Sequence, residues 1–315
     1  MLNRRHLRIK VLQALYAYFQ SDEENYARTE KELMTSVEKM YDLYIYLFLT
    51  FDEIRNIALH RIDENKKKLM PTEEDLHPNM KFVNNSLIQQ IQDSIQLRKV
   101  SETRKVNWVG DLNKEMFRKI LISIRESETF TIHMNNGIEG YEEDRQFLIE
   151  IFKAEIANSA LLFNFFEESS IFWMDDIDLT CSMVIKTIKS MEEGEPLELL
   201  PLFKPDDDEK EFIIELLRKA IDMNSSNEVL IDELTENWEL DRIAKMDVIL
   251  MKMAVTELQV FQNIPTKVTL NEYIEISKFY STPKSNGFIN GILDKAIDRL
   301  TKEKKIVKVG RGLMS

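Results

Sequence analysis

Apolar residues recur at intervals of three and four along most of this chain, which is the spacing that places them on one face of an α-helix. The pattern predicts a first helix over residues 3–20 and a long second helix from residue 21 to about residue 70, whose last turns run into a charged connection over 62–81. Further helices are predicted over 82–107, 112–126, 143–168 and 176–193, with a glycine-containing loop over 129–145.

The strongest break in the pattern lies between residues 194 and 208. This stretch collects one glycine, three prolines and three consecutive aspartates, which together favour a domain boundary. Beyond it, helices are predicted over 208–223, 226–237, 239–262, 270–281 and 286–301. We therefore expect an all-α protein with an N-terminal helical bundle over 1–205, in which residues 21–205 form a helical insert, a C-terminal bundle over 206–301, and a tail over 302–315.

The composition supports helices and excludes several classes of protein. Only 8 Gly and 7 Pro occur among 315 residues, which argues against turn-rich β folds and collagen-like chains. No uncharged run approaches the roughly 20 residues of a membrane-spanning helix, and the N-terminus has no export signal. One cysteine, Cys181, allows no intrachain disulfide. We expect a cytoplasmic protein that does not contact a membrane.

The net charge of −13 would argue against binding to nucleic acid if it were evenly spread. Residues 1–20, however, hold four basic and no acidic side chains, and residues 299–315 hold six basic side chains against one acid. Because salt screens distant charges, an acidic protein with basic ends can still bind an anion locally.

Signatures of catalysis are absent from the sequence, and we expect no enzymatic activity and no cofactor. The spacing Glu74-x-x-His77 occurs in carboxylate-bridged metal sites, but a single pair beside Pro78 is not enough for one, so no metal is expected. Cys181 lies within a predicted helix and is interpreted as a core residue.

The start of the first helix breaks a local rule. Arg4, Arg5, Arg8 and Lys10 lie near its N-terminus, where acidic residues are favoured by the helix dipole. Guanidinium groups beside the free amides of a helix start form a phosphate site, so these four residues are predicted to bind RNA. The three arginine side chains are expected to face solvent. The alternative is a solvated basic tip.

A second candidate RNA contact is the polar turn 281–287, which opens the last helix. Lys284, Ser285 and Asn286 are expected to bind an RNA backbone, and Tyr280 to stack on a base. The same turn is also explained as a capping structure alone. Gly287 and Gly291 are interpreted as places where another helix approaches closely.

Two parts of the sequence resemble the NusB family of transcription antitermination factors. The first is the basic start followed by Leu12–Tyr16. The second is a series of blocks in the family's order: 238–243, 246–258, 264–268, 271–278 and 288–295. Lys252 stands where the family commonly has Arg, and Lys284 stands where the family is often acidic or neutral.

The resemblance implies two packed helical bundles of NusB type, here with a large insert after the first helix. It also implies binding of the single-stranded boxA element of ribosomal RNA leaders together with the ribosomal protein NusE, within the elongating RNA polymerase complex. Asp241 and Asp247 match acids that face NusE, although acids are favoured near a helix start in any case. Two alternatives stay open: a protein-only helical scaffold, and an RNA-binding module like the NusB-like domain of ribosomal RNA methyltransferases.

Overall fold

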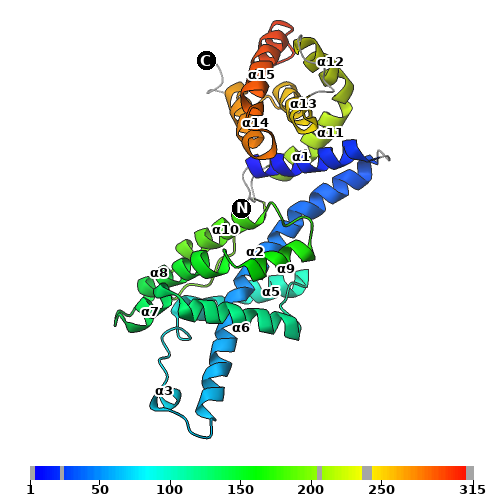
Figure 1. Cartoon of the computed structure of the whole chain (residues 1–315). Coiled ribbons are helices and arrows are strands. Elements are labelled where there is room, and N and C mark those ends of the chain that lie inside the picture. The colour runs from blue at the N-terminus through cyan, green and yellow to red at the C-terminus, as the bar shows by residue number, and fades with distance from the viewer. Residues whose placement is uncertain (1–3, 22–24, 204–207, 236–242, 310–315) are drawn as a thin grey trace. The chain divides into compact units, whose positions relative to one another are not determined.

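A computed structural model describes residues 4–21, 25–203, 208–235 and 243–309. The described residues form α-helices, one π-helical segment and connecting loops, without strands, so the all-α prediction is confirmed. The chain divides into two compact units: residues 1–37 with 203–315, and residues 38–202 (Figure 1). No helix among the described residues is long and apolar enough to cross a membrane.

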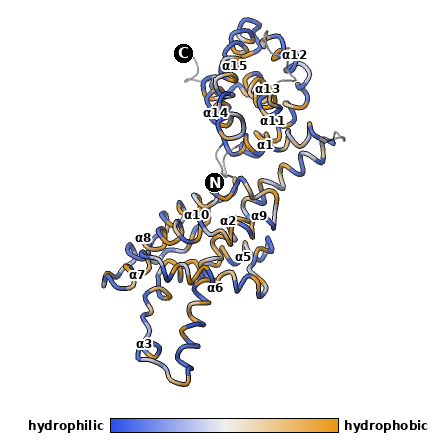
Figure 2. Tube along the Cα trace, in the orientation of Figure 1, coloured by the Kyte–Doolittle hydropathy of each residue, from blue (hydrophilic) through white to orange (hydrophobic). Residues whose placement is uncertain are grey.

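The first unit is built around one central helix. Its elements are α1 (Arg4–Gln20), the first turns of α2 (Tyr26–Lys66), α11 (Glu209–Asp222), α12 (Asn224–Leu234), α13 (Lys245–Val260), α14 (Thr266–Tyr280) and α15 (Ser285–Lys302). Every side chain from Ile249 to Leu258 is buried, because α1, α11, α12, α14 and α15 all pack on α13. In Figure 2, much of α13 has the orange colour of hydrophobic residues, as expected for a central helix.

The placement of α1 differs from the sequence-based grouping. Residues 3–20 were grouped with the insert, whereas α1 packs against α11, α13 and α14. It buries Leu7, Val11, Leu12 and Leu15 there, so its apolar stripe completes the C-terminal bundle. The insert accordingly has a core of its own.

The second unit contains the rest of α2 and the helices of the insert. These are α3 (Glu73–Leu76), α4 (Ser86–Gln92), α5 (Ile95–Arg104), α6 (Asp111–Glu126), α7 (Glu128–Asn135), α8 (Tyr141–Ile151), η1 (Phe152–Ile156), α9 (Ala160–Ser169) and α10 (Ile177–Ser190). Its core includes Phe51, Phe117, Phe147 and Phe152, all nearly or fully buried.

Several helix boundaries in the insert differ from the predicted ones, and helix-capping residues explain the differences. The single helix expected over 82–107 is two helices, because Asn85 and Ser94 each accept hydrogen bonds from amides of a new first turn. Ser159 caps α9 in the same way and ends the helix expected over 143–168. Ser127 caps α7, which occupies part of the predicted loop 129–145.

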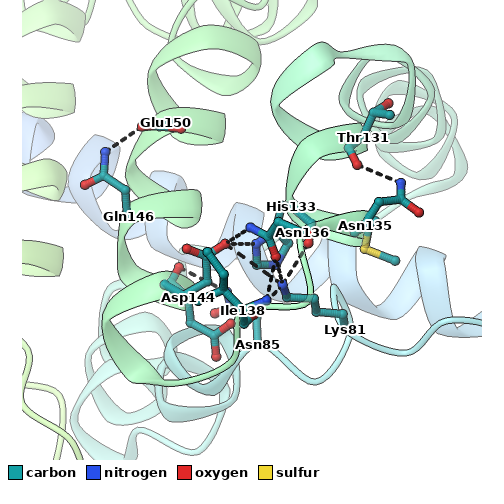
Figure 3. Close-up of polar contacts among 12 residues, drawn as sticks. Lys81, Asn85, Thr131, His133, Asn135, Asn136, Ile138, Asp144, Gln146 and Glu150 are labelled. Carbon is teal, nitrogen blue, oxygen red and sulfur yellow. Dashed lines mark hydrogen bonds and ion pairs between the residues drawn. The ribbon is translucent and has the colours of Figure 1, made fainter.

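A lysine-centred network fixes the connection between α7 and α8 (Figure 3). The Lys81 ammonium donates to the carbonyl oxygens of His133 and Ile138, at 2.7 and 2.6 Å, and to the side-chain oxygen of Asn136 at 2.7 Å. Asn79 donates to the carbonyl oxygen of Met134 at 2.8 Å. The segment after α3 is thereby held against the end of α7.

Candidate nucleic-acid interface

Arg8 does not face solvent, and this part of the sequence-based interpretation is wrong. Its side chain is 1% exposed, and its Nε and Nη2 each donate to a carboxylate oxygen of Glu257 at 2.7 Å. Thr269 and Tyr273 donate their hydroxyl protons to the same carboxylate, at 2.8 and 3.1 Å. Arg8 therefore joins α1 to α13 and α14 in the core.

The sequence contained a signal for this buried pair. Arg8 shares a helical stripe with Leu12 and Leu15, both of which are buried. Glu257 shares a helical stripe of α13 with Ala254 and Leu258, both of which are buried. A buried charge requires a partner, so an arginine and a glutamate on two apolar stripes are expected to pair.

Lys10 also leaves the candidate interface, since it is 2% exposed. Beside it in α1, His6 is half-buried, and burial together with the Arg5 charge lowers the pKa of the His6 imidazole. The accessible positive charge at this helix start belongs to Arg4 and Arg5.

Arg4 and Arg5 line an open cavity of about 430 Å³. Arg5 is 39% exposed and donates to Glu272 through Nε at 2.9 Å and Nη2 at 2.8 Å, so the remaining nitrogen, Nη1, can bind a further anion. Arg4 pairs with Asp208, and its guanidinium lies 5.1 Å from the centre of the Phe212 ring. The loop Asn263–Pro265 forms another wall of the cavity.

The basic tail approaches the same loop. The Lys308 ammonium donates to the carbonyl oxygen of Phe261 at 2.9 Å, and the Val309 amide donates to the carbonyl oxygen of Gln262 at 3.0 Å. These contacts hold the tail against residues that immediately precede the cavity wall.

The turn before α15 keeps two of its predicted contacts accessible. Lys284 is exposed and Asn286 is partly exposed, whereas Ser285 is 5% exposed and lies 2.7 Å from the Thr282 hydroxyl. Ser285 therefore stabilises the turn and is not available to RNA. Tyr280 is partly exposed at the end of α14.

Other features of this turn were missed or misread from the sequence. Phe279 is 80% exposed, which makes it a better stacking surface than the neighbouring tyrosine. Within the described part of the chain, a Cβ atom at Gly287 or Gly291 would meet nothing within 4 Å, so no described helix packs on these glycines. The face of α15 that bears these glycines is bare backbone that a ligand can approach closely.

The expected partner-facing acids have different outcomes. Asp241 lies outside the described residues. Asp247 is 3% exposed and accepts a hydrogen bond from the Ser281 hydroxyl, so it fixes the end of α14 to the start of α13 and does not face a partner. Lys252 is also nearly buried, where it binds Glu228 at 2.6 Å.

The two candidate RNA contacts, the Arg4–Arg5 cavity and the turn 281–287, both lie beside α14. Arg5 contacts Glu272 near the middle of α14, and the turn follows Tyr280 at its end. At 1.5 Å per residue, these eight positions span about 12 Å. Among the described residues, no three His, Cys, Asp or Glu side chains gather as metal ligands would.

Comparison with known proteins identifies the family. The model of the NusB family matches residues 180–298. The transcription antitermination protein NusB of Salinibacter ruber is 39% identical over 105 residues, which cover 33% of this chain and 66% of that protein. The NusB protein of Natranaerobius thermophilus is 43% identical over 72 residues, covering 23% of this chain and 52% of that protein.

A further relative is matched over most of its length. The NusB protein of Agathobacter rectalis is 38% identical over 106 residues, which cover 33% of this chain and 81% of that protein. The chain spans only 50% to 66% of the length of three other NusB relatives, those of Salinibacter ruber, Natranaerobius thermophilus and Chloroherpeton thalassium. No solved structure matches the chain. The similarity and the helical fold together show that this chain belongs to the NusB family, as a long member with additional helices after the first.

Proposed function

We propose that the chain is an RNA-binding transcription antitermination factor, which binds a boxA-like single-stranded RNA of ribosomal leaders together with NusE in the elongating polymerase complex. The observation that carries the proposal is the half-exposed Arg5 guanidinium at the start of α1, beside Arg4 and an open cavity. The names of the relatives, transcription antitermination proteins, support the same function.

The RNA path in this proposal follows α14. Phosphates contact Arg4 and Arg5 at one end and Lys284 and Asn286 at the other, and a base stacks on Phe279 or Tyr280. The exposed backbone at Gly287 leaves room for the strand. Asp241 remains the proposed contact to NusE.

Carboxylates already bind Arg4 and Arg5, and their negative charge weakens the attraction of RNA to the donors that remain, such as Nη1 of Arg5. Glu272 holds Arg5, and its negative charge repels a phosphate that approaches the same cavity. Arg5→Ala should weaken RNA binding, whereas Glu272→Gln should strengthen it. The gain is limited to about fivefold, because a partly exposed ion pair contributes at most about 1 kcal/mol.

The test is fluorescence anisotropy with a boxA-like RNA and a scrambled RNA, each with and without NusE. Three phosphate contacts predict a slope of about −2 in a plot of the logarithm of the binding constant against the logarithm of the salt concentration. Each lost contact should make this slope less steep by about 0.7. Arg28→Ala is the matched control, because Arg28 is exposed and pairs with Glu32 in the same unit. Equal effects of Arg28→Ala and Arg5→Ala, or binding insensitive to salt, would contradict the proposal.

The same measurement separates the alternatives. A protein-only scaffold would bind NusE and ignore both RNAs. A general RNA-binding module, like that of the methyltransferases, would bind both RNAs equally and gain nothing from NusE.

A further inference from the structure

The insert contains a cavity that the RNA-binding function does not use. Its volume is about 430 Å³, within the range of small-molecule sites, and its walls come from α2, α3, α6 and α7. The floor is apolar, and Phe82, Val83 and Leu121 are almost completely buried there. Phe130 and Met134, which are partly exposed, extend the apolar lining.

Two arginines from different helices line this cavity without an anionic partner. Arg61 comes from α2 and Arg125 from α6, and neither has a carboxylate within 4 Å among the residues that the structure describes. Burial, and then the positive charge of Arg61, lower the pKa of the Arg125 guanidinium, so the two groups repel each other.

The two arginines lie together in an insert where acidic residues outnumber basic ones. Some other arginines of this unit pair with carboxylates, as Arg104 does with Asp42 and Arg118 with Glu115. Both arginines are exposed, so water screens part of their repulsion, and a bound anion would relieve the remainder.

Two acids, Glu74 and Asp75, also line the cavity, but among the described residues neither forms an ion pair with the arginines. Asp75 is engaged elsewhere, because its carboxylate accepts hydrogen bonds from the Thr72 amide and from Lys68, both at 3.0 Å. Glu74 is an exposed carboxylate that forms no ion pair within the described chain. The lining residues alone carry two positive and two negative charges. Lys68, which pairs with Asp75 from outside the lining, brings the net charge of the site to +1.

The walls are held in place before any ligand arrives. Arg55 donates from Nε to the carbonyl oxygen of Val83 at 2.7 Å, which ties the floor to α2. Asn79 binds the carbonyl oxygen of Met134, and the Lys81 network fixes the adjacent segment (Figure 3). Preorganised walls lower the entropic cost of binding.

We propose that this cavity binds a small organic anion, whose carboxylate or phosphate is held by Arg61 and Arg125 and whose apolar body lies on Phe82, Leu121 and Phe130. Guanidinium groups suit such head groups because each offers two parallel donors to two oxygens. The apolar floor favours a ligand with a hydrocarbon or aromatic body over a simple inorganic ion. This site is independent of the RNA-binding surface.

The test titrates the full chain with 1-anilinonaphthalene-8-sulfonate, an anion with an aromatic body that fluoresces in apolar surroundings. We expect one site per chain. The double variant Arg61→Gln/Arg125→Gln should lose about tenfold or more in affinity. Arg118→Gln is the matched control, because Arg118 is exposed on the same helix as Arg125 but lies outside the cavity. An equal loss in the control, or no loss in the double variant, would overturn the proposal.

Competition identifies the head group. Displacement by decanoate alone indicates a carboxylate, and displacement by octyl phosphate alone indicates a phosphate. Displacement by both supports the general anion site. Failure of both to displace the probe, or displacement by inorganic phosphate at equal concentration, would overturn the role given to the apolar floor.

A second variant tests the floor without changing charge. Ala58 lines the cavity and is 8% exposed, so Ala58→Leu should fill part of the space. It should weaken binding of the displacing amphiphile at least fivefold while circular dichroism shows unchanged helix content. Unchanged affinity in a folded Ala58→Leu protein would place the ligand elsewhere.

Discussion

Arg8 provides the sharpest test of the structure, because the sequence and the structure predict opposite results for its removal. A solvent-facing arginine can be truncated with little effect on folding. In the structure, Arg8→Ala would leave the fully buried Glu257 carboxylate with the hydroxyls of Thr269 and Tyr273 as its hydrogen-bond partners among the described residues. Breaking a buried ion pair on one side costs about 3–5 kcal/mol.

Further losses add to this figure. The Arg8 guanidinium lies 5.3 Å from the centre of the Phe212 ring, a favourable cation–π contact that alanine removes. Arg5→Ala is the natural comparison, since that pair is partly exposed and should cost only about 0.2–1 kcal/mol. The double change Arg8→Met/Glu257→Met should cost less than Arg8→Ala, because no unpaired charge remains.

Hydrogen exchange measured by mass spectrometry can separate the two compact units. In Arg8→Ala, peptides from α13 and α14 should exchange at least about a hundredfold faster, since each 1.4 kcal/mol corresponds to a factor of ten. Peptides from α8, which lies in the other unit, serve as an internal control. If α13 exchanges no faster in Arg8→Ala than in Arg5→Ala, the buried pair does not stabilise this fold.

Other expected outcomes follow from buried polar groups. Asp247→Ala should destabilise the first unit by about 1–3 kcal/mol in urea unfolding, because it leaves the Ser281 hydroxyl without its acceptor, and Asp247→Asn should restore part of the loss. Burial lowers the pKa of His133, so the unfolded chain gains its proton at higher pH than the folded chain; stability of the insert should fall as pH drops below about 6.5, and His133→Phe should flatten that dependence. Burial raises the pKa of Cys181 to about 12, so a thiol reagent should modify it only after unfolding, and rapid modification of the native chain would contradict its burial.

The sequence alone determined the fold class and most of the helices of the first unit. The regular recurrence of apolar residues is a local property, and the predicted helices over 208–223, 270–281 and 286–301 correspond to α11, α14 and α15 within a few residues. The family resemblance rested on the same local blocks. It also singled out the basic start of the chain, where Arg4 and Arg5 remain accessible.

Only the tertiary structure decided which charges are available. Arg5 and Arg8 are neighbours with the same chemistry, yet one is half-exposed and the other is sealed against Glu257, a residue 249 positions away. The packing of α1 on α13 likewise depends on long-range contacts. Arg61 and Arg125 come to line the same cavity only because the fold brings α2 and α6 to its walls. Helix periodicity depends on neighbours in the sequence, whereas burial and pairing depend on neighbours in space, which a single sequence does not list.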